Sequence, residues 1–260
     1  MRLFAGDGRK AMILSHRHRF IFVKGTKVGG TSVEIALSGI CGPDDIVTPV
    51  IPIDDRPRIE RGHPPRNYAS SRAIELDYER RIRECAPGRL QAEELPPQTL
   101  VFYNHMPLSE IELKVAVPLD GYAVVCVERN PYAKAISLAN WSAQGTAYGR
   151  GRPMRFDLNE TRRALDIIIA NGAILRCRNI DRYRRANGEL AVKIMRFDAL
   201  EDDFAEWMKR LGIPPPCPVL PHAKAGNYTA RPIDVLSMSQ IAAINDLFRE
   251  EFAFFGYPTL

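Results

Sequence analysis

The chain has 260 residues, 45% of them hydrophobic, which is enough for one sizeable α/β core. Its formal net charge of +5 favours an anionic ligand, but without clustered aromatic or Gly-rich RNA motifs it does not indicate nucleic-acid binding. The sequence has no apolar run of roughly 20 residues, no recognisable signal peptide and no Cys-x-x-Cys pair. We therefore expect a cytoplasmic protein with reduced thiols and no membrane span.

The first half of the sequence predicts a strand, a loop, a helix and an insertion. The strand is the short apolar run at 20–23, and it leads directly into a glycine-bearing loop at 24–32. A helix follows from about residue 33 to 40. At about 48–98 the composition changes, with many prolines and arginines and a charged helix at about 70–85. We interpret this segment as an insertion into a single domain that spans the whole chain, 1–260.

The second half predicts an alternation of strands and helices. Strands are expected at 99–103, 122–127 and 190–195. Helices are expected from Pro131, at about 160–185 with a break near Asn171 and Gly172, at 200–211 and at 239–252. This order indicates an α/β fold with a parallel sheet that is covered on both faces. Ligands of such sheets bind at the carboxyl ends of the strands.

The loop after the first strand has the composition of an anion site. Lys27 supplies a positive charge, Thr31 and Ser32 supply hydroxyl groups, and the following helix directs its positive end toward the loop. We expect the glycines at 25, 29 and 30 to let backbone amides approach an anion closely. The loop is not a Walker A loop, because its lysine precedes the glycine pair. An ordinary strand-to-helix turn with an exposed lysine is the alternative.

Two other segments carry candidate functional residues. Arg129 ends the third predicted strand beside the helix cap Asn130, which suits bidentate binding of a phosphate, and Ser137 lies about two turns into that helix. His105 follows the second predicted strand, and an imidazole in this place is suited to general base catalysis. Taken alone, each of these residues is more often structural than functional.

Together the three segments resemble the sulfotransferases, in the branch that includes the carbohydrate sulfotransferases. Those proteins carry a Pro-Lys-Thr-Gly-Gly-Thr-Ser type loop, and residues 26–32 here are Thr-Lys-Val-Gly-Gly-Thr-Ser. They also carry an Arg-Asn-Pro-Tyr-x-Arg-x-x-Ser type segment, which corresponds to 129–137 here, with Lys134 in place of the second arginine. The resemblance covers about residues 20–41 and 99–257.

The resemblance implies a three-layer α/β/α, P-loop-like fold with a central parallel sheet, and a function. The function is transfer of a sulfuryl group from 3′-phosphoadenosine 5′-phosphosulfate (PAPS) to a hydroxyl of a sugar or small metabolite, without a metal. Arg129 and Ser137 would hold the 3′-phosphate, and Lys224 in a late loop is a further candidate contact. His105 would be the general base, and Lys27 would stabilise the leaving nucleotide. The 5′-phosphosulfate would lie on the loop residues Lys27, Val28, Gly29, Gly30, Thr31 and Ser32.

Two other classes of protein remain as alternatives. A P-loop phosphotransferase would use a nucleoside triphosphate and magnesium, but the third predicted strand ends in Glu128-Arg129 and not in an aspartate. A non-catalytic anion-binding or nucleic-acid-binding module would bind polyanions in a salt-dependent way without turnover. The histidine and the lysine beside the loop favour an enzyme over this module.

Overall fold

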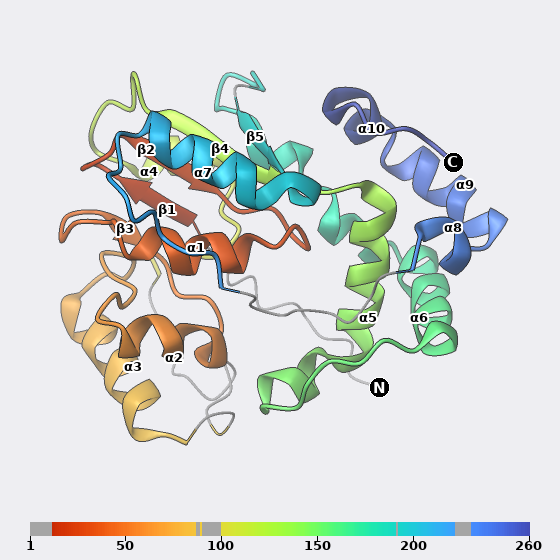
Figure 1. Cartoon of the computed structure of the whole chain (residues 1–260), viewed down its shortest axis with the longest axis horizontal. Helices are drawn as coiled ribbons and strands as arrows, with labels where there is room; N and C mark the ends of the chain where they lie inside the picture. Colours follow the sequence, from red (N-terminus) through yellow and green to blue (C-terminus); the bar gives the residue numbers. More distant parts are fainter. Residues whose placement is uncertain (1–11, 87–88, 90–99, 191, 222–229) are drawn as a thin grey trace.

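The computed structural model describes residues 12–86, 89, 100–190, 192–221 and 230–260. These residues form an α/β protein around a mixed sheet with the strand order β3-β1-β2-β4-β5 (Figure 1). The strands β2, β4 and β5 are parallel, whereas β1 is antiparallel to both of its neighbours. The strands are β1 (Met12–Ser15), β2 (Phe20–Val23), β3 (Ile46–Val47), β4 (Ala123–Glu128) and β5 (Lys193–Arg196).

The strands predicted at 20–23 and 122–127 are confirmed as β2 and β4, and the strand predicted at 190–195 lies slightly later, as β5. The sequence pattern does not predict β1 or β3. Both are short, and β1 joins β2 through the tight turn at 16–19. The antiparallel β1 therefore makes the sheet mixed, where the sequence predicts a parallel one.

The predicted strand at 99–103 is wrong where the chain is described. Leu100 forms only an isolated bridge with Ala69, and the N–H of Phe102 donates to the carbonyl of Tyr68. Both edges of β2 are already paired, with β1 on one side and β4 on the other. The apolar run therefore packs Phe102 against one face of the sheet instead of adding a strand.

The helices of the structure confirm most of the helices that the sequence predicts. The helix predicted at 160–185 ends at Ala170 and continues as two short 3-10 turns, because the left-handed Gly172 interrupts it. The helices are α1 (Gly30–Ser38), α2 (Pro52–Glu60), α3 (Arg72–Glu84), α4 (Leu108–Lys114), α5 (Pro131–Gly149), α6 (Leu158–Ala170), α7 (Leu200–Arg210), α8 (Pro232–Val235), α9 (Met238–Leu247) and α10 (Arg249–Phe255). The 3-10 turns are η2 (Ala173–Cys177), η3 (Ile180–Tyr183) and η4 (Phe197–Ala199).

Apolar side chains cover both faces of the sheet. On one face α1 and α7 pack against β2 and β4, with Phe20 and Trp207 edge to face at 5.1 Å between ring centroids. On the other face lie α4, η3 and the end of α10. The helices α5, α6, α8 and α9 form a further apolar cluster, which Figure 1 shows to one side of the sheet. The helices α2 and α3 of the predicted insertion pack on each other through Ile59, Tyr78 and Ile82.

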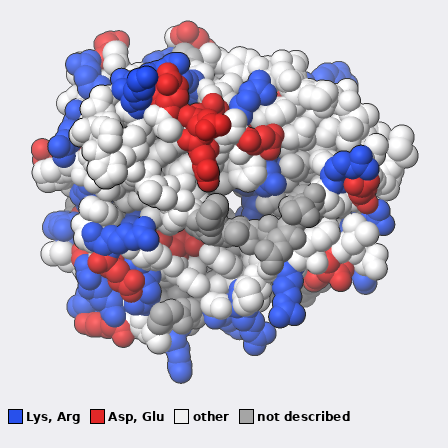
Figure 2. Space-filling model, in the orientation of Figure 1, with Lys and Arg blue, Asp and Glu red and all other residues white. Residues whose placement is uncertain are grey.

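Basic and acidic side chains lie interspersed over the face shown in Figure 2. All five cysteines are free thiols, and Cys126 and Cys177 are buried. Burial raises the pKa of Cys177 to about 12. In the described part of the chain, no helix combines the length and the hydropathy needed to cross a membrane.

Candidate functional site

The loop with Lys27, Arg129 and Phe197 each follow one of the parallel strands β2, β4 and β5. The loop 24–29 follows β2, Arg129 follows β4, and Phe197 follows β5. Because the strands are neighbours and parallel, these segments lie at one edge of the sheet. The Arg129 guanidinium carbon lies 4.1 Å from the centroid of the Phe197 ring. A Cβ atom added to Gly29 would lie 2.7 Å from the same ring. Phe197 therefore connects the loop with Arg129.

The start of the loop is fixed by a buried ion pair. Lys24 is 5% exposed, and its Nζ lies 2.5 Å from a carboxylate oxygen of Glu34, which is fully buried on α1. Burial raises the pKa of Glu34, and the nearby Lys24 opposes this effect. The ion pair fastens the end of β2 to the helix that follows the loop.

The glycines of the loop are closely packed by side chains of the protein. A Cβ on Gly25 would lie 2.8 Å from the side-chain nitrogen of Asn179, and a Cβ on Gly30 would lie 2.7 Å from Cγ of Lys24. Together with Phe197 beside Gly29, these contacts show that protein side chains fill the space next to each glycine. Close packing within the protein therefore requires glycine at these positions, independently of any ligand.

We expect Gly29→Ala to destabilise the protein more than Gly188→Ala. Both glycines have positive φ angles, 79° and 86°, so each alanine adds about 1–2 kcal/mol of left-handed backbone strain. Only at Gly29 would the new Cβ also collide with a ring, because at Gly188 no atom of the described residues, its chain neighbours aside, lies within 4 Å of that position. This overpacking adds roughly 1–3 kcal/mol to the destabilisation of Gly29→Ala. Urea denaturation of both variants measures the difference, and equal losses would contradict the packing around Gly29.

Lys27 points toward α5. Its Nζ lies 4.6 Å from the centroid of the Trp141 ring, and its backbone is left-handed with φ of 66°. A left-handed lysine is uncommon, and such residues gather at functional sites. Val28, in contrast, is fully buried in the core between α1 and the sheet. Thr31 and Ser32 lie in the first turn of α1, which begins at Gly30, about three residues before the predicted start.

Ser137 lies on the same helix as Trp141. Trp141 is four positions after Ser137, so the two side chains are neighbours on one face of α5. Because the Trp141 ring contacts Lys27, this face of α5 is turned toward the loop. At the start of α5 the side chain of Asn130 accepts the N–H of Tyr132 at 3.0 Å, which confirms the predicted cap. The helix thus carries Ser137 on the side where the loop lies.

His105 contacts the loop, although no strand precedes it. Its Nδ1 lies 2.9 Å from the carbonyl oxygen of Lys24, and its backbone is left-handed with φ of 59°. A carbonyl can only accept, so Nδ1 carries the proton in this contact and Nε2 is the proton-accepting nitrogen of the neutral ring. This tautomer is the one that a general base acting through Nε2 requires.

Sequence reasoning missed Asn179, which lies between η2 and η3. Its Oδ1 accepts the N–H of Thr26 at 2.7 Å, and its Nδ2 donates to the carbonyl of Thr26 at 3.2 Å. Asn179 follows the arginine-rich sequence Arg176-Cys177-Arg178 and shows no glycine, strand-end or motif signal. The contact joins residues 153 positions apart, so only the tertiary structure reveals it.

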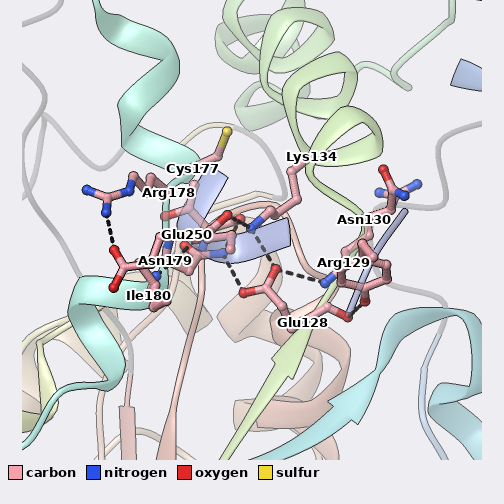
Figure 3. Close-up of polar contacts among 12 residues, drawn as sticks. Glu128, Arg129, Asn130, Lys134, Cys177, Arg178, Asn179, Ile180 and Glu250 are labelled. Atoms are coloured by element: carbon pink, nitrogen blue, oxygen red, sulfur yellow. Dashed lines mark hydrogen bonds and ion pairs between the residues drawn. The ribbon is translucent and has the colours of Figure 1, made fainter. Parts of the chain in front are cut away.

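Lys134, which stands in place of the second arginine of the motif, is turned into the protein and does not face a ligand. Its Nζ lies 2.7 Å from Glu128 and 2.6 Å from Glu251, and all three side chains are 0% exposed (Figure 3). Burial alone would lower the pKa of Lys134, but the two carboxylates raise it. Glu128 in turn accepts the backbone N–H of Arg129 at 2.8 Å. The charge of Lys134 therefore supports Arg129 from inside the protein.

Lys224, the predicted contact in a late loop, lies outside the described residues. In the ranges that are described, no group of three or more His, Cys, Asp or Glu side chains could hold a metal ion. Comparison of the chain with family models, curated proteins and solved structures gives no match.

Proposed function

We propose that this chain is a sulfotransferase that moves a sulfuryl group from PAPS to the hydroxyl of a sugar or small metabolite, on a three-layer, P-loop-like fold. The observation that carries the proposal is the contact of His105 with the carbonyl of Lys24. It brings the candidate base to the loop that also bears Lys27, and Phe197 brings Arg129 to the same loop. A base and two cations thus surround one loop at the end of a parallel strand pair.

The groups around the loop suit a donor with two anionic ends. Lys27 and Arg129 supply positive charge, the first turn of α1 supplies backbone N–H groups, and Ser137 supplies a hydroxyl. In the proposal the loop binds the 5′-phosphosulfate, and Arg129 with Ser137 binds the 3′-phosphate. The Thr26 N–H does not take part, because Asn179 already accepts it.

In the proposed reaction each residue has one task. His105 takes the proton of the acceptor hydroxyl at Nε2 while that oxygen bonds to sulfur, and the bond between sulfur and the bridging oxygen of the nucleotide breaks. Lys27 stabilises the negative charge that develops on this bridging oxygen. The products are a sulfate ester and 3′-phosphoadenosine 5′-phosphate (PAP). Sulfuryl transfer resembles phosphoryl transfer, in which positioning and charge stabilisation supply most of the rate acceleration.

Calorimetric titration with PAP, ADP and ATP without magnesium tests the donor site. We expect preferential binding of PAP and at least a tenfold weaker affinity in Arg129→Ala, because a charged hydrogen bond contributes about 1.5–3 kcal/mol. Arg249→Ala is the matched control, since its side chain is 80% exposed and pairs only on the surface with Asp246. Absence of PAP binding, with ATP binding once magnesium is added, would contradict the proposal and favour a phosphotransferase.

A further inference from the structure

The side-chain amide of Asn179 uses its full hydrogen-bonding capacity on the loop and its surroundings. Oδ1 accepts from the N–H of Thr26 at 2.7 Å and from Nη1 of Arg182 at 2.9 Å. Nδ2 donates to the carbonyl of Thr26 at 3.2 Å and to a carboxylate oxygen of Glu128 at 3.4 Å. Because two donors face one end of the amide and two acceptors face the other, its orientation is defined.

The backbone of Asn179 is held from the opposite side by α10. The N–H groups of Asn179 and Ile180 both donate to Oε1 of Glu251, the second at 3.0 Å. The other oxygen of this carboxylate pairs with Lys134, which also pairs with Glu128. Figure 3 shows Asn179 beside Glu128 and Lys134 in this buried group. Glu251 therefore fixes the backbone of Asn179, and the Asn179 side chain extends from this fixed position to the loop.

We propose that Asn179 is a positioning residue for the anion-binding loop. Its side-chain amide hydrogen-bonds both the N–H and the carbonyl of Thr26, as a neighbouring β-strand would. The next residue, Lys27, has a left-handed backbone with φ of 66°, so the chain turns immediately after these two hydrogen bonds. Asn179 thereby holds the loop in its ligand-ready shape before a ligand arrives. The inference deepens the proposed function, since it assigns a residue to the 5′-phosphosulfate side of that site.

A loop that is ordered in advance does not lose conformational freedom when it binds, and this raises its affinity. The effect should be confined to ligand groups that lie on the loop. Arg129 is supported mainly by the other oxygen of the Glu128 carboxylate. That oxygen, Oε1, accepts the N–H of Arg129 and pairs with Lys134, whereas Asn179 makes only a 3.4 Å contact with Oε2. We therefore expect loss of Asn179 to weaken binding of a 5′-phosphate strongly and binding of a 3′-phosphate little.

Two variants and one control test the role. Asn179→Ala removes both bonds to Thr26. Asn179→Asp keeps an acceptor for the Thr26 N–H but loses the donor and places negative charge against Glu128. Asn171→Ala is the control, since Asn171 Oδ1 accepts only the nearby N–H of Ala173 at the exposed end of α6. All three are measured in the full-length chain.

The first measurement is hydrogen exchange of the Thr26 amide without any nucleotide. We expect protection in the wild type and in Asn171→Ala, about tenfold or more faster exchange in Asn179→Ala, and unchanged protection of Phe22 in β2. Faster exchange at Phe22 as well would mean general destabilisation and would overturn a specific role. An unprotected Thr26 amide in the wild type would overturn the proposal even if Asn179→Ala does not fold.

The second measurement is the affinity for PAP, adenosine 5′-phosphate and adenosine 3′-phosphate. We expect Asn179→Ala to bind PAP and the 5′-phosphate about tenfold more weakly, with the 3′-phosphate within twofold of wild type, and Asn179→Asp to be at least as impaired. Equal weakening of all three ligands would overturn the positioning role. Failure of the wild type to bind PAP would instead contradict the proposed function, while the exchange result at Thr26 still decides the role of Asn179.

Discussion

Lys134→Met is expected to lower the free energy of unfolding by about 3–5 kcal/mol at pH 8, which is typical when one partner of a buried ion pair is removed. The substitution would leave the carboxylates of Glu128 and Glu251 buried without the ammonium that lies 2.7 and 2.6 Å from them. Urea denaturation measures the loss. Lys114→Met is the control, because the partly exposed Lys114 on α4 pairs with one carboxylate, that of Glu110, and donates to the carbonyl of Val101 near the surface. The free energy of unfolding of Lys114→Met should fall by less than about 1 kcal/mol.

The loss in Lys134→Met should become smaller as the pH falls. Burial raises the pKa of Glu128, and Lys134 opposes this rise in the wild type. Without Lys134 the pKa rises further above its value in the unfolded chain, so folding favours the protonated carboxyl. A raised carboxyl pKa contributes stability at pH values below the unfolded pKa and loses it as the pH rises through the folded pKa. A destabilisation that is equal at pH 5 and pH 8 would contradict this account.

His105→Asn is expected to reduce turnover by about 100-fold to 10,000-fold, the usual contribution of a general base. Asparagine tolerates the left-handed backbone at this position, where φ is 59°, and it can still donate to the carbonyl of Lys24. It has no group that takes a proton at neutral pH. The affinity for PAP should therefore stay within about twofold of wild type while the rate of sulfate transfer falls.

His18→Ala is the matched control for this prediction. Nε2 of His18 also lies near a backbone carbonyl, that of Ile40, at 3.1 Å. His18 precedes β2, however, whereas the loop follows β2 at its other end. We expect His18→Ala to leave the transfer rate unchanged. Near-wild-type turnover in His105→Asn would remove His105 from the role of base, and a large loss of PAP affinity would assign it to nucleotide binding instead.

Several features of the site follow from local sequence. The run Phe20–Val23, the glycine pair and the apolar positions that follow predict β2, the loop and α1. Asn130 before Pro131 predicts the cap and the first turn of α5, and the structure confirms both. These features depend on neighbouring residues only, because capping, turn formation and hydrophobic periodicity act over a few positions.

Other features depend on contacts between distant segments. The sequence does not distinguish Lys134, which is buried between two carboxylates, from a lysine that faces a ligand. It does not reveal that Asn179 holds Thr26, or that Phe197 lies between Gly29 and Arg129. The apolar run at 100–103 resembles a strand, yet both edges of β2 are already paired with β1 and β4.

Local sequence thus determines β2, β4, most of the helices and the loop after β2, together with the charged and hydroxyl groups that these segments carry. The tertiary structure decides which of these groups are turned inward and which stay at the site. The physical reason is that burying a charge or a polar amide requires a partner, and here the partners come from α10 and from the segment between η2 and η3. Glu251 and Asn179 are more than 100 positions beyond the loop that they support.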